Sequence, residues 1–205
     1  MTSRNDSLIS RLRKNTVETT KPPRAEAVRE TAPVPVTHDL RMASQDELTV
    51  FIVAGEHSGD VLGGGLMREL TSRRKGQIRF IGVGGEAMEA QGLTSLFPLA
   101  DIAVMGPLAI LQALPRLTNR VYRTVAAGVT AKPDIIVIID SPEFTHQVAK
   151  RLSRQLPDTP IIDYVCPSVW AWRPGRAKKM ARIIDHVLAL LPFEPDALER
   201  LNGPP

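Results

Sequence analysis

The sequence predicts an α/β fold built on a mainly parallel sheet, and two patterns lead to this prediction. Short runs of Ile and Val alternate with segments of helical period, as in repeated strand–helix–strand units. The runs are apolar on both faces, which is typical of strands that helices cover on both sides. The chain has 205 residues, of which 43% are hydrophobic and 23% charged, and can therefore bury a core.

Residues 1–46 differ in composition from the rest of the chain. They combine Ser, Thr, charged residues and prolines without a sustained apolar period, and so bury too little surface to offset chain entropy. We expect a disordered tail over 1–46 and one folded domain over 47–205. Met42 lies just before the first expected strand and is a candidate for the native start of the protein.

Apolar runs place the strands, and helical period places the helices between them. The expected strands are Leu48–Ala54, Ile78–Val83, Ile135–Asp140, Ile161–Val165 and Val187–Leu190. The expected helices are Asp60–Arg74, Leu108–Ala127, Phe144–Gln155 and Arg176–Ile184. Because open α/β sheets bind ligands at the carboxyl ends of their strands, functional residues are expected in the loops that follow the strands.

Charge and cysteine content argue against several functional classes. Residues 42–205 hold 18 basic and 17 acidic side chains, so no nucleic-acid partner is expected.

The single cysteine, Cys166, cannot form an internal disulfide and is interpreted as a small buried residue in a reducing compartment. No Cys/His cluster has zinc-like spacing, so no metal is expected. No apolar run reaches the roughly 18 residues of a membrane-spanning helix, and no secretory signal is expected.

The loop after the first strand combines glycines with two acids and a hydroxyl group, within residues 54–60. Glycines permit tight turns and the close approach of a ligand, and the start of a helix attracts anions or hydroxyl groups. Glu56, Ser58 and Asp60 are therefore candidate residues for binding sugar hydroxyls. The alternative is that Ser58 or Asp60 only caps the helix. No Gly-Lys-Ser/Thr follows, so the loop is not a P-loop.

The turn after the second strand, Gly82-Val83-Gly84-Gly85-Glu86-Ala87, fits the G-x-G-x-x-A pattern of dinucleotide sites. It does not follow the first strand, and Asp101 does not end another clear strand, so we expect no nicotinamide or flavin cofactor. Gly84 and Gly85 are interpreted as a tight turn whose backbone lies near a bound ligand.

Asp140 ends a strand that otherwise consists of Ile and Val. Partial desolvation raises the basicity of a carboxylate, which a general base for a hydroxyl group needs. Asp140 is therefore the candidate catalytic residue. Its alternative role is to cap the next helix or to pair with an arginine.

Both tryptophans, Trp170 and Trp172, lie in one loop with two prolines. A rigid aromatic and cationic loop at a strand end can stack on a sugar ring, face acyl chains and hold a phosphate. Alternatively, one of the two tryptophans packs in the core, but core packing does not explain the whole motif.

An apolar segment that runs into a basic stripe predicts a surface for an anionic membrane or a lipid phosphate. Its apolar part includes Leu108, Ile110 and Leu111, and Arg116, Arg120 and Arg123 share one helix face after it. These six residues are expected to face the membrane. A buried helix with a solvated rim is the alternative.

Six motifs follow one another in order over about residues 48–200. They are Ala54-Gly55-Glu56-x-Ser58-Gly59-Asp60, Gly82-Val83-Gly84-Gly85, Ala103-Val104-Met105-Gly106, Ile139-Asp140-Ser141-Pro142, Pro167-Ser168-Val169-Trp170-Ala171-Trp172-Arg173 and Leu191-Pro192-Phe193-Glu194. Together they resemble lipid-A-disaccharide synthase. The run around the tryptophans is highly specific, and the other motifs are individually modest.

The resemblance implies a Rossmann-like domain that is the N-terminal, acceptor-side half of a two-domain glycosyltransferase of the GT-B type. That family joins UDP-2,3-diacylglucosamine to 2,3-diacylglucosamine 1-phosphate with inversion and release of UDP. It implies a peripheral protein on the cytoplasmic face of the inner membrane. By this resemblance Asp140 takes the proton of the acceptor 6-hydroxyl, and Met105, Ser168, Trp172 and Arg173 join the substrate-binding residues. No cofactor is implied, and no Asp-x-Asp metal motif occurs.

The chain ends where that family continues into a second domain of roughly equal size, which holds most of the nucleotide. A missing C-terminal half or a separately encoded partner subunit is therefore expected. The alternative is a non-catalytic binding module, either truncated or one part of a split enzyme. A further interpretation, a dinucleotide-dependent oxidoreductase, depends on the Gly82 turn alone.

Overall fold

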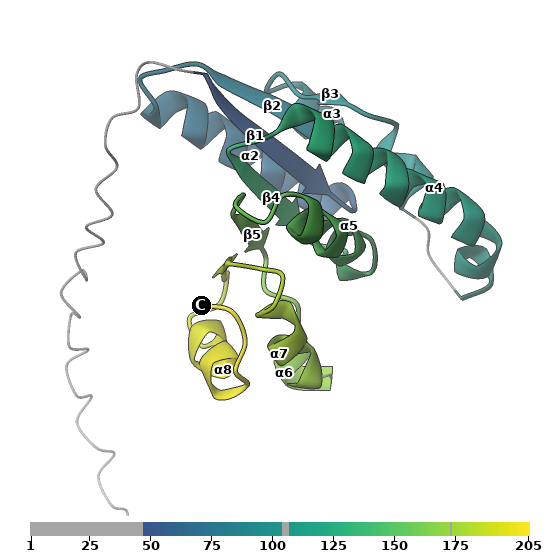
Figure 1. Ribbon diagram of the computed structural model, residues 1–205, viewed down its shortest axis with the longest axis vertical. Helices are drawn as coiled ribbons and strands as arrows, with labels where there is room; N and C mark the ends of the chain where they lie inside the picture. Colours follow the sequence, from purple (N-terminus) through teal and green to yellow (C-terminus); the bar gives the residue numbers. More distant parts are fainter. Residues whose placement is uncertain (1–46, 104–106, 173) are drawn as a thin grey trace, which may run out of the picture. The chain divides into compact units, whose positions relative to one another are not determined.

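The computed structural model describes residues 47–103, 107–172 and 174–205, so the tail expected over 1–46 lies outside the described residues. In these residues the centre is a six-stranded parallel sheet with the order β3-β2-β1-β4-β5-β6 (Figure 1). The strands are β1 (Leu48–Ala54), β2 (Ile78–Val83), β3 (Thr94–Ser95), β4 (Ile135–Ile139), β5 (Ile161–Tyr164) and β6 (His186–Leu188). This is the strand order of the Rossmann fold, so the predicted Rossmann-like parallel sheet is confirmed.

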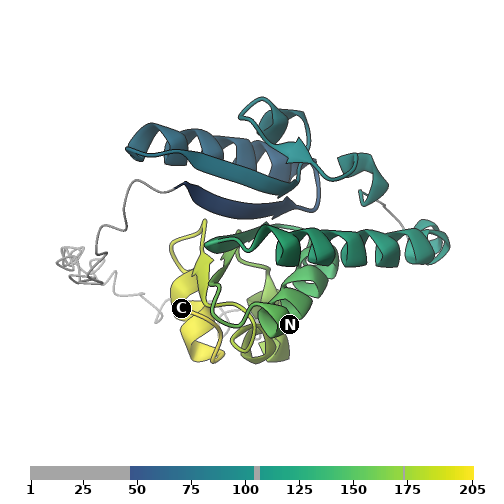
Figure 2. The same ribbon diagram turned by 45° about the horizontal axis from the view of Figure 1, so that its top comes forward.

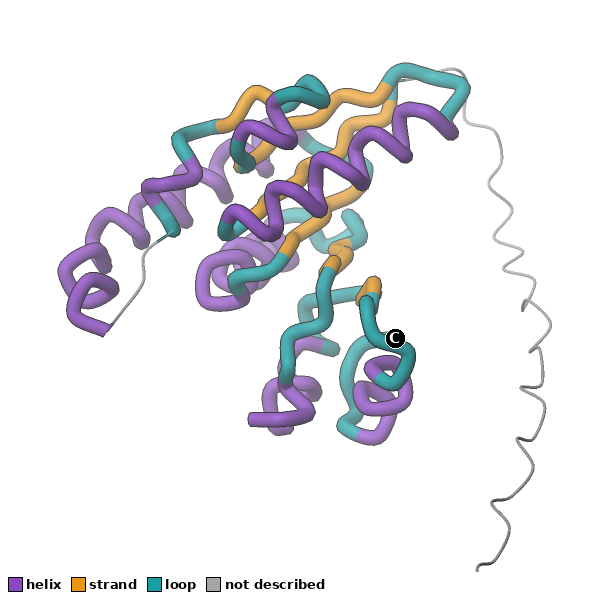
Figure 3. Tube along the Cα trace, turned by 180° about the vertical axis from the view of Figure 1, so that it is seen from behind, coloured by secondary structure: helices purple, strands orange, loops and turns teal. Residues whose placement is uncertain are grey.

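Helices connect the strands (Figure 3). The longer ones are α2 (His57–Arg73), α4 (Pro107–Ala131), α5 (Pro142–Gln155) and α8 (Glu194–Arg200). Single turns form α3 (Glu86–Glu89), α6 (Val169–Trp172), α7 (Ala177–Met180) and the 3-10 turns η1 (Leu99–Asp101) and η2 (Pro174–Arg176). Among the helices of the described ranges, none is both long enough and apolar enough to cross a membrane.

All nine predicted elements are present, but most of their ends differ from the predicted ones by one to four residues. β1 and β2 have the predicted ends. The prediction for β4 was one residue too long, because Asp140 takes a left-handed conformation with φ of 55°. The helix predicted over Arg176–Ile184 ends at Met180, since the N–H groups of Ile183 and Ile184 both donate to the Met180 carbonyl in a closing turn. β3 and α8 were not predicted.

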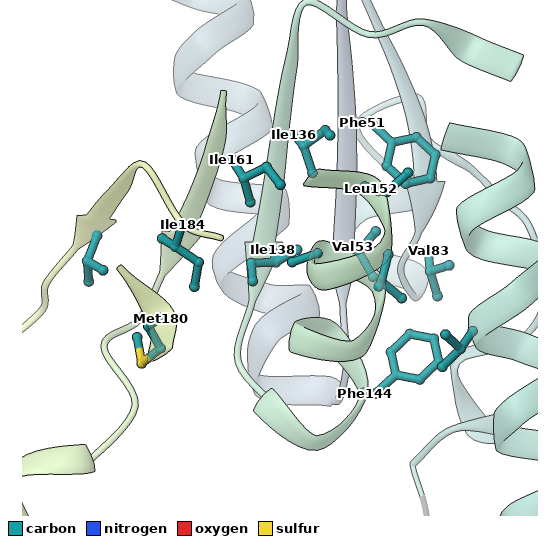
Figure 4. Close-up of a cluster of buried hydrophobic side chains, with 14 of the residues drawn as sticks. Phe51, Val53, Val83, Ile136, Ile138, Phe144, Leu152, Ile161, Met180 and Ile184 are labelled. Carbon is teal, nitrogen blue, oxygen red and sulfur yellow. The ribbon is translucent and has the colours of Figure 1, made fainter. Parts of the chain in front are cut away.

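Side chains of the central strands alternate between two cores, one on each face of the sheet. Val50 and Ile52 pack on the face that α2 covers. Phe51 and Val53 point the other way and pack on the face that α4 and α5 cover (Figure 4). Figure 2 shows β1 and β2 between α2 and α4. The predicted burial of both strand faces is thereby explained.

The direction in which the chain adds strands reverses between β1 and β4. From β1 the chain continues outward to β2 and β3, and from β4 it continues the opposite way to β5 and β6. Loops that leave neighbouring strands in opposite directions open a crevice at the carboxyl edge of the sheet, which is where ligands of such sheets bind. The loop after β1 and Asp140 after β4 both lie at this crevice.

Asp60 has a structural role in place of the predicted contact with substrate. Its side chain is fully buried, and its carboxylate accepts hydrogen bonds from the backbone N–H groups of Gly85, Ala87 and Met88 at 2.7, 3.0 and 3.1 Å. The carboxylate therefore caps the first turn of α3 and fixes the turn after β2. It does not cap α2, the helix to which Asp60 belongs.

We predict that Asp60→Asn lowers the free energy of unfolding by about 1–3 kcal/mol, because the amide NH2 replaces one acceptor oxygen and leaves at least one of the three backbone N–H groups facing a donor. Urea denaturation measures the loss. The matched control is Glu86→Gln, which changes an exposed acid of α3 and should shift the free energy by less than about 0.5 kcal/mol. Equal stability of the two variants would contradict this role of Asp60.

We also predict that Gly82→Ala prevents stable folding. Gly82 pairs with Ile52 of β1, has φ of 151°, and a Cβ atom there would lie 1.8 Å from the Ile52 carbonyl oxygen. The matched control is Gly65→Ala in α2, where a Cβ atom meets nothing within 4 Å and a gain of about 0.5–1 kcal/mol is expected. Thermal unfolding distinguishes the two variants, and a Gly82→Ala protein as stable as the parent chain would refute the prediction.

Candidate functional site

Three of the residues predicted from the sequence meet at the crevice between β1 and β4. The Ser58 hydroxyl oxygen lies 2.9 Å from Oε1 of Glu56 and 3.0 Å from Oδ2 of Asp140. Glu56 lies in the loop after β1 and Ser58 in the first turn of α2, whereas Asp140 follows β4, 82 residues further along the chain than Ser58. One hydroxyl group thus joins the segments that follow the two strands.

The backbone around Asp140 is strained and firmly held. Asp140 and Ser141 have φ of 55° and 45°, a conformation that costs energy for residues other than glycine and that concentrates at functional sites. The buried Thr145 donates its hydroxyl proton to the Asp140 carbonyl at 2.7 Å. The Ser141 N–H donates to Oδ1 of Asp140, also at 2.7 Å. Neither alternative for Asp140 is seen among the described residues, since its carboxylate neither caps α5 nor pairs with an arginine.

The close approach of the two loops requires the glycine at position 55. A Cβ atom on Gly55 would lie 2.2 Å from the Cβ atom of Ser141. The Gly55 N–H donates to the Ile139 carbonyl at 3.2 Å, which extends the pairing of β1 and β4 to the mouth of the crevice. A side chain at this position would separate the start of α2, which carries Ser58, from Asp140.

One serine proton cannot satisfy two carboxylates at the same time. When Glu56 is protonated, it can donate to Ser58, and Ser58 can donate to Asp140. The pKa of Glu56 is raised above its ordinary value in agreement with this arrangement. The hydrogen bond from Ser58 lowers that pKa, but the hydrogen bond and negative charge of Asp140, together with partial burial, outweigh it.

Two cavities share Asp140 in their lining. The larger, of about 760 Å³, lies along α4 and α5 and has an apolar wall that includes Leu117, Val121 and Phe144. The smaller, of about 310 Å³, lies between α5 and the segment after β5, and most of its polar lining is ionisable. Asp140 therefore adjoins one cavity with an apolar wall and a second, called the polar cavity below, whose lining holds more ionisable side chains.

The polar cavity contains a pair of residues that the sequence analysis missed. His146 of α5 and Asp163 of β5 lie with Nε2 and Oδ2 3.0 Å apart, and the Asp163 side chain is only 2% exposed. Burial raises the pKa of Asp163 above its ordinary value, and the hydrogen bond and charge of His146 partly offset this. The signal in the sequence was an acid inside an apolar strand, the same signal that pointed to Asp140.

The other predicted substrate-binding residues have varied positions. The N–H of Gly84 donates to the Ser95 hydroxyl and that of Gly85 to Asp60, so this turn uses those donors internally. Ser168 is exposed and lines the polar cavity. Met105 and Arg173 lie outside the described residues, as does the side chain of Trp172, whose backbone belongs to α6. Within the described part of the chain, no cluster of three or more His, Cys, Asp or Glu side chains could hold a metal ion.

The predicted basic stripe lies on α4, but its three arginines differ. Arg116 and Arg123 are exposed. Arg120 pairs with Asp101 and stacks on the Phe97 ring at 4.7 Å, so it faces inward and departs from the predicted contact with a membrane. The predicted membrane-facing side chains of Leu108, Ile110 and Leu111 lie outside the described part, although their backbone belongs to α4.

Comparison with solved structures supports the fold alone. The UDP-GlcNAc 2-epimerase of Neisseria meningitidis superposes with a TM-score of 0.55 at 12% identity, over 77% of this chain and 44% of that one. Another UDP-N-acetylglucosamine 2-epimerase gives a TM-score of 0.54 at 14% identity, over 77% and 46% of the two chains.

Comparison of sequences is more specific. Lipid-A-disaccharide synthase of Rhodopseudomonas palustris is 55% identical over 157 residues, which are 77% of this chain and 40% of the relative. The protein of that name from Nitrobacter hamburgensis is 52% identical over 163 residues, 80% of this chain and 41% of the relative. The chain thus spans about two fifths of the length of these relatives. Because residues 50–202 also match the family model described as lipid-A-disaccharide synthetase, the chain belongs to this family of glycosyltransferases.

Proposed function

We propose that residues 47–205 form the acceptor-side domain of an enzyme that transfers 2,3-diacylglucosamine from its UDP derivative to 2,3-diacylglucosamine 1-phosphate. The observation that carries the proposal is the hydrogen-bonded set of Glu56, Ser58 and Asp140 at the switch point of the sheet. Family membership supplies the substrates. The nucleotide of the donor is bound by the part of such an enzyme that this chain does not cover.

Asp140 acts as the general base in this proposal. The oxygen of the acceptor 6-hydroxyl attacks the anomeric carbon of the donor, the bond from that carbon to UDP breaks, and the hydroxyl proton passes to Asp140. Attack opposite the leaving group inverts the anomeric centre. Ser58 orients the carboxylate, and Glu56 holds Ser58, so the reacting oxygen meets a fixed geometry.

The apolar cavity beside Asp140 supports an acceptor that carries acyl chains. Its wall of Leu117, Val121 and Phe144 offers such a chain apolar contacts, whereas the glucosamine hydroxyls can reach Glu56 and Asp140, which also line the cavity. A lipid acceptor also explains why an exposed basic helix lies next to this cavity.

We further propose that the protein binds the surface of the inner membrane through α4. Arg116 and Arg123 are exposed on this helix, and with Asn119 and Arg120 they line a cavity of about 480 Å³. Exposed guanidinium groups on a helix surface attract anionic lipid headgroups. Arg120 supports the helix from inside through Asp101 and Phe97.

The decisive experiment measures UDP release with both sugar lipids. We define the completed enzyme as this chain followed by the part of the Rhodopseudomonas palustris relative beyond the matched region, and we expect it to release UDP while the chain alone does not. Asp140→Asn in the completed enzyme should lower kcat by about 10²–10⁴-fold with little change in the acceptor KM, because a general base acts only in the transition state.

Asp158→Asn is the matched control, because Asp158 is exposed and lies before β5, at the opposite end of the strands from the crevice. It should leave kcat unchanged. No UDP release by the completed enzyme would refute the proposed reaction, and a full rate in Asp140→Asn would move the base to another residue. Robust turnover by the chain alone would refute the division into acceptor and nucleotide domains.

The membrane proposal is tested with vesicles. We expect the chain to co-sediment with vesicles that contain phosphatidylglycerol, and Arg116→Glu with Arg123→Glu should weaken this binding by at least about tenfold at low salt, because each basic residue contributes about 1 kcal/mol. Arg68→Glu with Arg182→Glu is the matched double reversal, since both are exposed and neither belongs to α4. If both double variants lose vesicle binding equally, the attraction is general and electrostatic, and α4 has no specific role.

A further inference from the structure

His146 and Asp163 form a pair of ionisable side chains that is almost completely buried. Burying such groups costs free energy, so we ask what the pair does. Asp163 lies in β5 with 2% of its side chain exposed, and His146 shields it with 13% of its own side chain exposed. A buried carboxylate needs a charge or a hydrogen-bond donor beside it. The His146 imidazole provides that donor through Nε2, so the tautomer or charge state of the ring is tied to Asp163.

The second nitrogen of His146, Nδ1, has no hydrogen bond to any other residue in the described ranges. His146 lines the same cavity as Asp140, and the negative charge of Asp140 acts on Asp163 across this space. The other ionisable groups of the lining are Glu143 from α5, Cys166 from the segment after β5 and Arg176 from η2. Arg176 pairs with Glu143 at 3.2 Å. Among the described lining residues, His146 is the one whose side chain is an imidazole.

A carboxylate that orients an imidazole beside a reacting group is a recurrent way to move a proton near neutral pH. Asp140 and His146 line the same cavity, so a proton on Asp140 can pass to a neutral imidazole there. The cavity of about 310 Å³ that both side chains line has room for water.

We propose that His146, oriented by Asp163, takes up the proton that Asp140 receives from the acceptor hydroxyl. This inference rests on the proposed glycosyl transfer. The proton leaves the acceptor oxygen for Asp140 and then passes through water to Nδ1 of His146. The imidazolium is balanced by the Asp163 carboxylate, Asp140 returns to its ionised form, and the imidazolium loses the proton to solvent before the next turnover. His146 acts through Asp140 and makes no contact with substrate in this scheme.

The kinetic test uses the completed enzyme. His146→Gln keeps a hydrogen-bond donor for Asp163 but cannot take up a proton, and should lower kcat at least about tenfold with the acceptor KM unchanged. In His146→Ala, added imidazole should restore most of the rate, because a free base replaces the missing one. His186→Gln is the matched control, an exposed histidine at the start of β6. A normal kcat in His146→Gln, or a loss in His146→Ala that imidazole does not relieve, would overturn the proposal.

A second measurement needs no activity and therefore separates this inference from the proposed reaction. NMR of the imidazole nitrogens in the full chain follows the titration of His146. If His146 and Asp140 share one cavity, Asp140→Asn should move this titration to lower pH, because a nearby negative charge favours the imidazolium. Asp158→Asn should leave it unchanged. A His146 titration that does not respond to Asp140→Asn would overturn the proposal even if the enzyme releases UDP.

Discussion

The site depends on how closely the loop after β1 approaches the loop after β4. Parallel pairing of β1 with β4 brings the two carboxyl ends together, and Gly55 lets the backbones come closer than any side chain would permit. The Ser58 hydroxyl then reaches Asp140 across the crevice. Thr145 and the pairing at Gly55 hold the strained backbone at Asp140 and Ser141 on both sides.

Three buried or half-buried acids of this domain are stabilised in three different ways, and this decides what each can do. Asp60 is fully buried and accepts hydrogen bonds from three backbone N–H groups, so its carboxylate is not accessible to a ligand. Asp163 is also buried, but its partner is the imidazole of His146, which can gain or lose a proton. Asp140 accepts a hydrogen bond at each oxygen and still lines both cavities. It is therefore the acid that can exchange a proton with a bound molecule.

The sequence predicted those parts of the structure that apolar periodicity controls. The bounds of β1 and β2 follow directly from their Ile- and Val-rich runs, and glycines and acids after the strands located the crevice. The sequence could not show that the Asp60 side chain points inward, because the three backbone groups that bind it lie 25 to 28 residues further along the chain. For the same reason it could not pair His146 with Asp163, or reveal that Arg120 faces Asp101. β3 is only two residues long and carries no periodic signal.

The charges around Asp140 favour a sugar ring over a phosphate group as the ligand of the polar cavity. Among the described residues of the polar cavity, Asp140, Glu143 and Asp163 are acidic, and of these only Glu143 pairs with an arginine, Arg176. A phosphate group placed here would meet uncompensated negative charge, at a cost that partial burial increases, and this holds for the 1-phosphate of the acceptor as well as for a diphosphate. Sugar hydroxyls instead find acceptors in Glu56 and Asp140. This balance supports the proposed acceptor role of the domain, and in that proposal the remainder of the enzyme stabilises the charge of the departing UDP.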